Sequence, residues 1–263
     1  MRSIYIMQLQ NKIALVTGSA TGIGEAIARR FAAEGARVMI HGREAEREAG
    51  ETIARELPNA AFCAAQLENP DECAALIEAV IQQFGSLDIL VNNAATIPRS
   101  NLHTTDAALF DHTIAVNVRA PFLLIKKAFA HKQNELRVLN IGSVNAYCGE
   151  ANLMAYSVSK GALMTLTRNL ADAHGAEGLR VNQINPGWVL TPNEYQTKIK
   201  DGLPENWPDI VPRSVVPGGR LLKPEEIAHF ALMFVADDAA LINGAVVELE
   251  QHPFIGRNPT KEA

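Results

Sequence analysis

The sequence predicts an α/β protein in which a doubly wound parallel sheet of about seven strands carries helices on both faces. Short runs rich in β-branched residues alternate with longer stretches of helical period along the chain. No repeat, low-complexity stretch or linker interrupts this alternation. The chain has 263 residues, enough to bury a substantial core, so we expect residues 1–263 to form a single domain.

The first half of the chain predicts four strands joined by helices. Lys12–Thr17 is a buried strand, and Gly22–Glu34 is a helix with Ile23, Ile27 and Phe31 on one face, ended by Gly35. The further elements expected here are strands Arg37–His41, Ala60–Gln66 and Leu87–Asn92 and helices Arg43–Glu56 and Pro70–Phe84.

The second half predicts three more strands and one long irregular segment. The expected elements are one or two helices over Thr105–Phe129, helices Met154–His174 and Pro224–Ala236, and strands Leu136–Ile141, Leu179–Ile184 and Ala245–Leu249. Five prolines fall between Trp188 and Leu222, in a stretch without a clean period. Because such long loops are usually lids or binding loops, we expect a substrate lid at about 188–222. The tail at 250–263 either lies on its own surface or docks Phe254 and Ile255 on a neighbouring subunit.

Composition excludes several classes of protein. Lys and Arg number 24 against 29 Asp and Glu, so the net charge of −5 offers no basic surface for nucleic acid. Cys63, Cys73 and Cys148 are scattered and odd in number, which favours buried free thiols in a reducing compartment over disulfides or a zinc site. Gln8 and Gln10 break the apolar start of the chain, and no stretch predicts a membrane span. We therefore expect a cytoplasmic protein that binds neither nucleic acid nor membrane.

A glycine-rich loop leads from the first strand into the first helix. It runs Thr17-Gly18-Ser19-Ala20-Thr21-Gly22-Ile23-Gly24. Gly18 allows a tight turn, Gly22 lets the backbone approach a pyrophosphate at the helix N-terminus, and Gly24 lets helix and strand pack closely. The loop predicts a dinucleotide-binding catalytic domain of the Rossmann type.

Further motifs lie at regular places along the chain. They are Asn92-Asn93-Ala94-Ala95 after the fourth strand, Asn117 in a helix, Ser143 after the fifth strand, Tyr156-Ser157-Val158-Ser159-Lys160, and Pro186-Gly187 with Thr191 after the sixth strand. Together with the glycine loop they resemble the classical short-chain dehydrogenase/reductase family over about Leu9–Leu249. The resemblance implies hydride transfer between a nicotinamide cofactor and a hydroxyl or carbonyl substrate. It also implies a homotetramer built on the helices at Thr105–Phe129 and Met154–His174.

Tyr156 and Lys160 form the centre of the expected catalytic site. They lie four residues apart on a predicted helix, so both side chains point from one face. A neighbouring ammonium favours a phenolate and lowers the pKa of a tyrosine from about 10. The resemblance implies that Tyr156 is the general acid/base and that Lys160 lowers its pKa and holds the nicotinamide ribose. It further implies that Ser143 positions the substrate oxygen and that Asn117 holds a water that relays protons to Lys160.

Two departures from the family bear on the cofactor. NAD-using members carry Asp at the end of the second strand, whereas this chain has His41 followed by Gly42 and Arg43. An arginine can pair with a 2′-phosphate that a carboxylate would repel, so NADP is favoured and NAD stays possible. Gln66 replaces an Asp after the third strand and can still hydrogen-bond adenine. The cofactor contacts that the resemblance implies are Gly18, Ser19, Thr21, Gly22, Ile23, Gly24, Arg43, Gln66, Leu67, Asn93, Ala94, Ala95, Tyr156, Lys160, Pro186, Gly187, Val189 and Thr191.

The segments expected to line the substrate pocket are polar. They contain Asn145, Glu150, Asn152, Asn193 and Glu194, together with Trp188, whose flat face suits a sugar ring. We therefore expect a small-molecule substrate, a sugar or polyol. One alternative is a 3-oxoacyl thioester on an acyl carrier protein, for which Lys126, Lys127 and Arg168 would supply a basic patch. A second alternative, from another class, is a regulator that senses NADP without turnover.

No motif predicts a metal site. The sequence has no HExxH or CxxC motif, and its histidines are scattered. We expect His41, His103, His112, His131 and His174 to be surface or partly packed residues.

Overall fold

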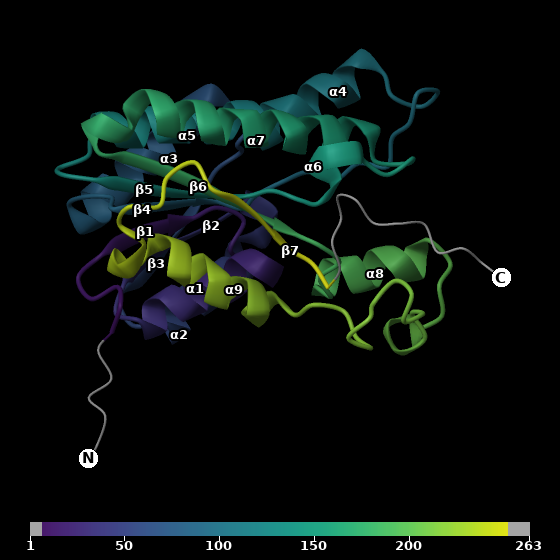
Figure 1. Cartoon of the computed structure of the whole chain (residues 1–263). Helices are drawn as coiled ribbons and strands as arrows, with labels where there is room; N and C mark the ends of the chain where they lie inside the picture. Colours follow the sequence, from purple (N-terminus) through teal and green to yellow (C-terminus); the bar gives the residue numbers. More distant parts are fainter. Residues whose placement is uncertain (1–6, 252–263) are drawn as a thin grey trace.

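The computed structural model describes residues 7–251 and contains one seven-stranded sheet with helices on both faces (Figure 1). The strands are β1 (Ile13–Val16), β2 (Arg37–Gly42), β3 (Ala60–Ala64), β4 (Ile89–Asn92), β5 (Leu136–Ile141), β6 (Leu179–Pro186) and β7 (Val246–Leu249). They pair in the order β3-β2-β1-β4-β5-β6-β7, and every pairing is parallel. The predicted doubly wound sheet is confirmed, and its order reverses between β1 and β4.

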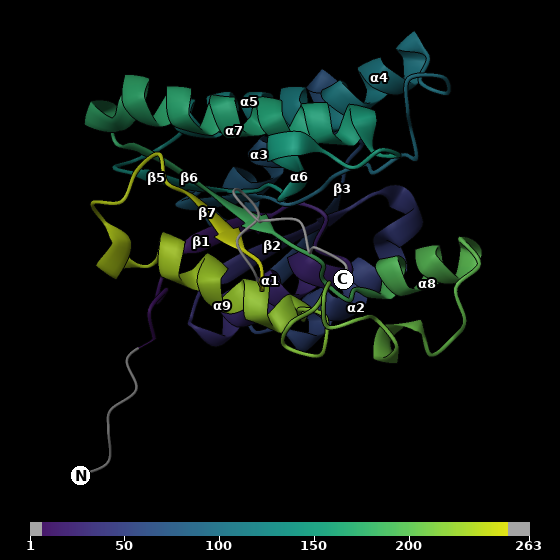
Figure 2. The same cartoon turned by 45° about the vertical axis from the view of Figure 1, so that its right-hand side comes forward.

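Helices cover the two faces of the sheet in separate groups, as Figures 1 and 2 show. One face carries α1 (Gly22–Ala33), α2 (Arg47–Glu56) and α9 (Pro224–Val235), and the other carries α3 (Pro70–Phe84), α5 (Ala120–Ala130) and α7 (Met154–His174). The remaining helices, α4 (Ala107–Ile114), α6 (Asn145–Cys148) and α8 (Pro192–Lys200), lie toward the carboxyl ends of the strands. The additional helices of this fold therefore gather at the carboxyl ends of the strands.

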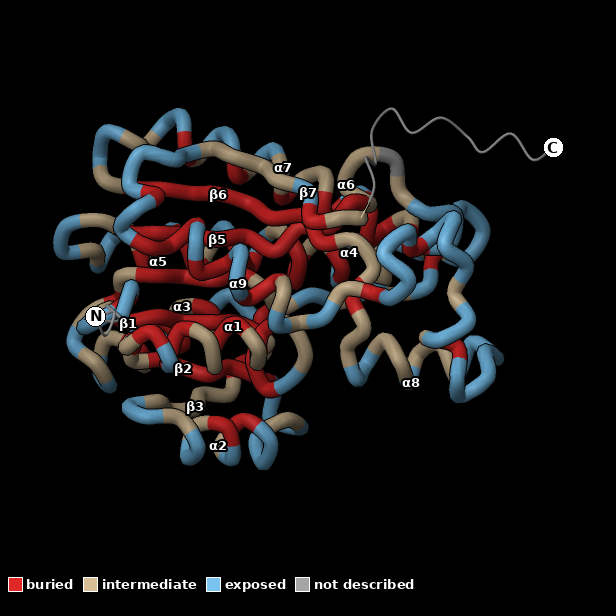
Figure 3. The backbone as a smooth tube through the Cα atoms, turned by 60° about the horizontal axis from the view of Figure 1, so that its bottom comes forward, coloured by how far each residue is buried: buried red, intermediate tan, exposed pale blue. Residues whose placement is uncertain are grey.

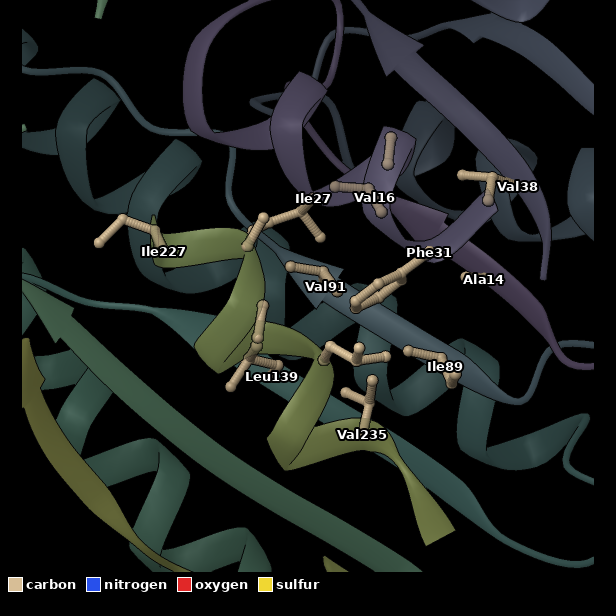
Figure 4. Close-up of a cluster of buried hydrophobic side chains, with 14 of the residues drawn as sticks. Ala14, Val16, Ile27, Phe31, Val38, Ile89, Val91, Leu139, Ile227 and Val235 are labelled. Atoms are coloured by element: carbon tan, nitrogen blue, oxygen red, sulfur yellow. The ribbon is translucent and has the colours of Figure 1, made fainter. Parts of the chain in front are cut away.

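The sheet separates two hydrophobic cores, because successive strand residues point to opposite faces. Ala14 and Val16 of β1 face the α1–α9 side, where Phe31 and Val235 pack (Figure 4). Leu15, the residue between them, faces the other side, where α3 and α5 pack. Figure 3 shows the inner strands buried along most of their length, while the edge strands β3 and β7 are mostly only partly buried. Burial on both faces explains why β1 and most of β4 are runs of apolar residues. The polar side chains of β5 and β6 are buried as well.

The lid segment contains more regular structure than the sequence predicts. Helix α8 and a 3₁₀ turn at Trp207–Asp209 lie within 188–222. Pro192 is one of the five prolines of this stretch, and it stands in the first turn of α8, where its missing N–H is harmless. The side chain of Thr191 caps the helix by accepting the Glu194 N–H at 3.0 Å.

The predicted helical run over Thr105–Phe129 is α4 and α5 joined by a π-helical turn at Ala115–Arg119. By length and composition alone, Ala107–Ala130 would be long and apolar enough to cross a membrane, contrary to the expectation from the sequence. In the fold, its residues Leu124, Ile125 and Ala128 lie in the core against the sheet. Such packing is typical of a core helix of a globular domain.

The cysteine prediction can be followed at two positions. Cys73 is a buried free thiol and Cys63 a partly buried one, as expected. The proposed docking of Phe254 and Ile255 lies outside the described residues.

His41 is wholly buried, so the prediction of a surface or partly packed histidine is wrong. Its exposed fraction is 2%, and its ring bridges two neighbouring segments. Nδ1 accepts the Gly18 N–H at 3.0 Å, and Nε2 lies 3.2 Å from the carbonyl oxygen of Ala65, to which it donates. Burial lowers the pKa of His41 to about 4, so the imidazole is neutral. The buried ring supplies the acceptor for the Gly18 N–H of the glycine loop, which explains its inward orientation.

Replacing His41 by Gln should flatten the acid side of the stability profile. The unfolded chain takes up a proton on His41 near its ordinary pKa of 6.5, while the folded protein does so only near 4. The wild type should therefore lose roughly 3 kcal/mol of unfolding free energy between these pH values, and His41→Gln should lack this component. Urea unfolding at several pH values measures it, with the exposed His112→Gln as control. Parallel profiles for wild type and His41→Gln would contradict the assignment.

Candidate active site

The glycine loop forms a cradle at the carboxyl end of β1. Gly18 has φ +62°, and a Cβ there would lie 2.9 Å from Cα of Ala94. A Cβ on Gly24 would lie 2.3 Å from the Gly18 carbonyl oxygen, so a side chain is excluded at both positions. Thr21 precedes α1 without a side-chain cap, whereas α3, α4 and α8 are capped by side chains. The open N–H groups at the positive end of α1 fit a pyrophosphate.

Thr17 and Asn93 join the glycine loop to the end of β4. Thr17 Oγ1 accepts the backbone N–H groups of Asn93 and Ala94, each at 3.0 Å. Asn93 Nδ2 donates to the carbonyl oxygens of Thr17 and Gly18. The Thr191 side chain stands next to Gly22, 3.5 Å from the position of a Cβ there. Thr17 had no predicted role, although a buried threonine before a glycine loop was visible in the sequence.

The other predicted cofactor residues differ in exposure: some have side chains open to solvent and others are buried. Arg43 is exposed and Gln66 partly exposed near the ends of β2 and β3. Leu67 and Val189 are buried, and the hydroxyl of Ser19 is turned inward to the Val16 carbonyl oxygen. The remaining predicted contacts, Ile23, Ala95, Pro186 and Gly187, lie at or near the same sheet edge.

The structure brings Tyr156, Lys160 and Ser143 together as the sequence predicts. Tyr156 and Lys160 lie on α7 and are buried, and Ser143 follows β5. The Ser143 side chain hydrogen-bonds the Tyr156 hydroxyl. Lys160 Nζ donates to the carbonyl oxygen of Ile141 at 2.7 Å and lies 5.5 Å from the Tyr156 ring centroid.

Burial dominates the proton affinities of this pair. It raises the pKa of Tyr156 to about 12, even though the bond from Ser143 acts in the opposite direction and lowers it. The carboxylate of Glu194 raises the pKa of Tyr156 further. Burial also lowers the pKa of Lys160 to about 8. The sequence predicts a lowered tyrosine pKa, but in this structure desolvation raises the pKa of Tyr156 instead.

Asn117 clamps two segments of the site. Its Oδ1 accepts the Thr96 N–H, and its Nδ2 donates to the Thr96 carbonyl oxygen and to Ser159 Oγ, all at 2.9 Å. Ser159 in turn donates to the Tyr156 carbonyl oxygen at 2.6 Å. Both amide hydrogens are therefore used in fixing the loop after β4 to α7.

A buried chain of polar side chains supports Ser143 from behind. Asn185 Oδ1 accepts the Ser143 N–H at 3.1 Å and the Gln183 amide at 2.7 Å. The chain continues across the sheet through Thr167, Asn140 and Asn92. Apart from Asn92, which belongs to the motif after the fourth strand, these residues were not predicted, since a polar residue in a strand gives no sequence signal of its partner.

Two predicted substrate residues interact with each other in the lid. Trp188 stacks on Trp207 with centroids 5.5 Å apart, and its Nε1 donates to Glu194 Oε1 at 2.8 Å. One face of Trp188 is thus taken by the small core of the lid, in place of the free face expected for a sugar ring. Glu194 Oε1 also lies 3.8 Å from Lys198 Nζ. Of the other predicted contacts, Asn145 is partly buried and Glu150, Asn152 and Asn193 are exposed.

Within residues 7–251, no group of three or more His, Cys, Asp or Glu side chains is placed to hold a metal ion.

Comparison with known proteins identifies the family. A family model described as enoyl-(acyl carrier protein) reductase matches residues 18–250. The chain belongs to the short-chain dehydrogenase/reductase family. Its curated relatives include an uncharacterized oxidoreductase of Thermotoga maritima, 36% identical over 93% of this chain and 98% of the relative. Others are cis-4-hydroxycyclohexanecarboxylate dehydrogenase of Sinomonas cyclohexanicum (35%, 91% and 95%) and glucose and ribitol dehydrogenase of Daucus carota (32%, 91% and 84%).

Solved structures of this family share the fold. A 3-ketoacyl-(acyl-carrier-protein) reductase from Brucella melitensis in complex with NADH has a TM-score of 0.81 at 31% identity, covering 92% of this chain and 98% of that one. A short-chain dehydrogenase from Burkholderia cenocepacia in complex with NADP has a TM-score of 0.80 at 28% identity, covering 93% and 98%. This dehydrogenase/reductase is therefore an oxidoreductase that acts on hydroxyl groups with a nicotinamide cofactor, which argues against the sensor alternative.

Replacing Glu194 by Gln should shift the pH profile of this dehydrogenase/reductase toward lower pH. The carboxylate of Glu194 disfavours the Tyr156 phenolate, so its removal should lower the pKa of Tyr156. We expect the alkaline rise of kcat/KM for alcohol oxidation to move by up to about one pH unit. Glu205→Gln, an exposed carboxylate of the same lid, is the matched control and should leave the profile in place. An unchanged profile in Glu194→Gln would show that Glu194 does not act on Tyr156.

Proposed function

We propose that this enzyme interconverts a hydroxyl and a carbonyl group on a sugar or polyol, with NADP favoured over NAD. The observation that carries the proposal is the placement of Glu194 where its charge acts on the buried Tyr156. A carboxylate there accepts hydrogen bonds from neutral hydroxyl groups and repels anionic substrates.

The residues of the chain take distinct parts in this reaction. The Tyr156 hydroxyl exchanges a proton with the substrate oxygen, and the bond between Ser143 and Tyr156 places a second hydroxyl at the same point. Lys160 is fixed by the Ile141 carbonyl oxygen, and Asn117 holds α7 against the loop after β4. A bound nicotinamide would supply or accept the hydride. The glycine loop, Asn93 and Thr191 would hold that cofactor at the sheet edge.

Names of relatives support a hydroxylated substrate. The carrot relative is named for glucose and ribitol, and a relative from Serratia marcescens is named a meso-2,3-butanediol dehydrogenase. The polar rim of Asn145, Glu150, Asn152 and Asn193 is in keeping with such ligands.

The alternative substrate is a 3-oxoacyl thioester on an acyl carrier protein. It draws support from the Brucella structure, whose protein is named a 3-ketoacyl-(acyl-carrier-protein) reductase. The basic patch that an acidic carrier would need is weakened, because Lys127 Nζ already pairs with Glu78 at 2.6 Å. We therefore place this substrate second.

The preference for NADP rests on Arg43, which follows β2 directly; its side chain is 64% exposed and its guanidinium could pair with a 2′-phosphate. A homotetramer, which the family resemblance implies, and a cytoplasmic location, which the scattered cysteines favour, complete the proposal.

A substrate panel tests the proposal directly. Absorbance of the reduced nicotinamide should report turnover of an aldose or polyol with NADP, and weaker turnover with NAD. The panel should also contain simple alcohols and 3-oxoacyl thioesters. Reduction of a thioester alone would overturn the sugar or polyol, and turnover with NAD alone would overturn the role of Arg43.

Replacing Tyr156 by Phe should abolish most of the turnover found in that panel. Loss of the proton-transfer group is expected to lower kcat by about 10²- to 10⁴-fold, while cofactor binding is retained. Tyr195→Phe, which removes an exposed hydroxyl bound to the Glu205 carbonyl oxygen, is the control and should keep most of the activity. Comparable rates for Tyr156→Phe and wild type would refute the catalytic assignment.

A further inference from the structure

Glu46 occupies the space beside the end of β2. Gly42 is the last residue of that strand, and a Cβ on Gly42 would lie 3.1 Å from Oε2 of Glu46 and 3.2 Å from Cβ of Ala20 in the glycine loop. The carboxylate of Glu46 therefore stands where a side chain at the strand end would enter. In doubly wound dinucleotide-binding sheets, the acidic group that meets the adenosine ribose comes from this region, about 20 residues beyond the glycine loop.

Both oxygens of Glu46 are bound to Arg43. Oε2 accepts the Arg43 backbone N–H at 2.7 Å, and Oε1 accepts from the Arg43 guanidinium at 2.8 Å. Partial burial alone would raise the pKa of Glu46, but its bonds to Arg43 lower that pKa overall, so the carboxylate is ionised. The cation expected to receive a 2′-phosphate thus already has an anionic partner.

A 2′-phosphate and the Glu46 carboxylate compete for one guanidinium. Arg43 can leave Glu46 for the phosphate, which places an unpaired carboxylate beside a dianion, or it can stay and leave the phosphate without its partner. Glu68 adds a further negative charge that acts on Arg43. A ribose that carries only hydroxyl groups meets no such conflict, since the hydroxyls can donate to Glu46.

We propose that Glu46 sets the cofactor selectivity of this enzyme, by accepting the ribose hydroxyl of NAD and by opposing the binding of the NADP phosphate to Arg43. The inference rests on the proposed function, because it assumes that the adenosine end of a nicotinamide cofactor lies against β2. Arg43 then raises the affinity for NADP and Glu46 lowers it. The wild-type preference for NADP over NAD is therefore weaker than Arg43 alone would give.

Glu46→Gln tests the proposal without removing the loop contact, because the amide oxygen can still accept the Arg43 N–H. Fluorescence titration should give the dissociation constants of NADPH and NADH for wild type and variant. We expect Glu46→Gln to bind NADPH about tenfold more tightly and NADH no more tightly than the wild type. Glu44→Gln is the matched control, since Glu44 lies in the same turn, is exposed and pairs with Arg47 instead.

A second pair of variants tests whether Glu46 acts on NADPH affinity through Arg43. In an Arg43→Gln background, the gain in NADPH affinity from Glu46→Gln should largely disappear, because the phosphate has lost its partner. An unchanged ratio of NADPH to NADH affinity in Glu46→Gln, or an equal change in Glu44→Gln, would overturn the proposal while leaving the proposed function intact. Failure of the wild type to bind either dinucleotide would overturn the proposed function, and this inference with it.

Discussion

Thr17 ties the carboxyl ends of β1 and β4 together, and the site is built on that junction. Its hydroxyl accepts two backbone N–H groups beyond β4 and donates to the Val91 carbonyl oxygen, while Asn93 returns two hydrogen bonds to the glycine loop. The two strands flank the point where the sheet order reverses, and such a point opens a crevice for a ligand. Because Thr17 is buried and these hydrogen bonds lie within the chain itself, the loop is held before any ligand arrives. Gly18 can lie this close to Ala94, and Gly24 this close to Gly18, only because neither glycine has a side chain.

Desolvation governs the chemistry on the other side of the crevice. Tyr156 and Lys160 are both buried, and burial disfavours the charged form of each, so their pKa values move toward one another. A tyrosine near 12 and a lysine near 8 leave both groups neutral in a window between those values. Charges that face the pair therefore have large effects, since little water screens them. Glu194 is such a charge, and the lid that carries it takes part in setting the proton affinity of Tyr156.

Two carboxylates, Glu194 and Glu46, oppose the effect of neighbouring groups at the two ends of the crevice. Glu194 lies in the lid, where the indole N–H of Trp188 holds it, and its charge raises the pKa of Tyr156. Glu46 faces the end of β2, where it is held by Arg43. In each case a short helical segment that is not part of the glycine loop or the YxxxK motif carries the carboxylate. Differences among relatives that share the fold can arise from such segments, because loops at the carboxyl edge vary without disturbing the two cores.

The sequence by itself determined the layered sheet, the succession of strands and helices along the chain, and the residues of the glycine loop and YxxxK motif. These follow from local periodicity and from fixed spacings, which a single chain displays directly. Only the tertiary structure showed that His41 is buried, that Trp188 packs on Trp207 and that Asn185 supports Ser143. It also showed that Glu46 bonds to Arg43 and that Glu194 acts on Tyr156. The contacts of His41, Trp188, Asn185 and Glu194 join residues far apart along the chain, or depend on which way a side chain turns. The sequence carries no period or spacing that encodes either, so the folded chain alone decides them.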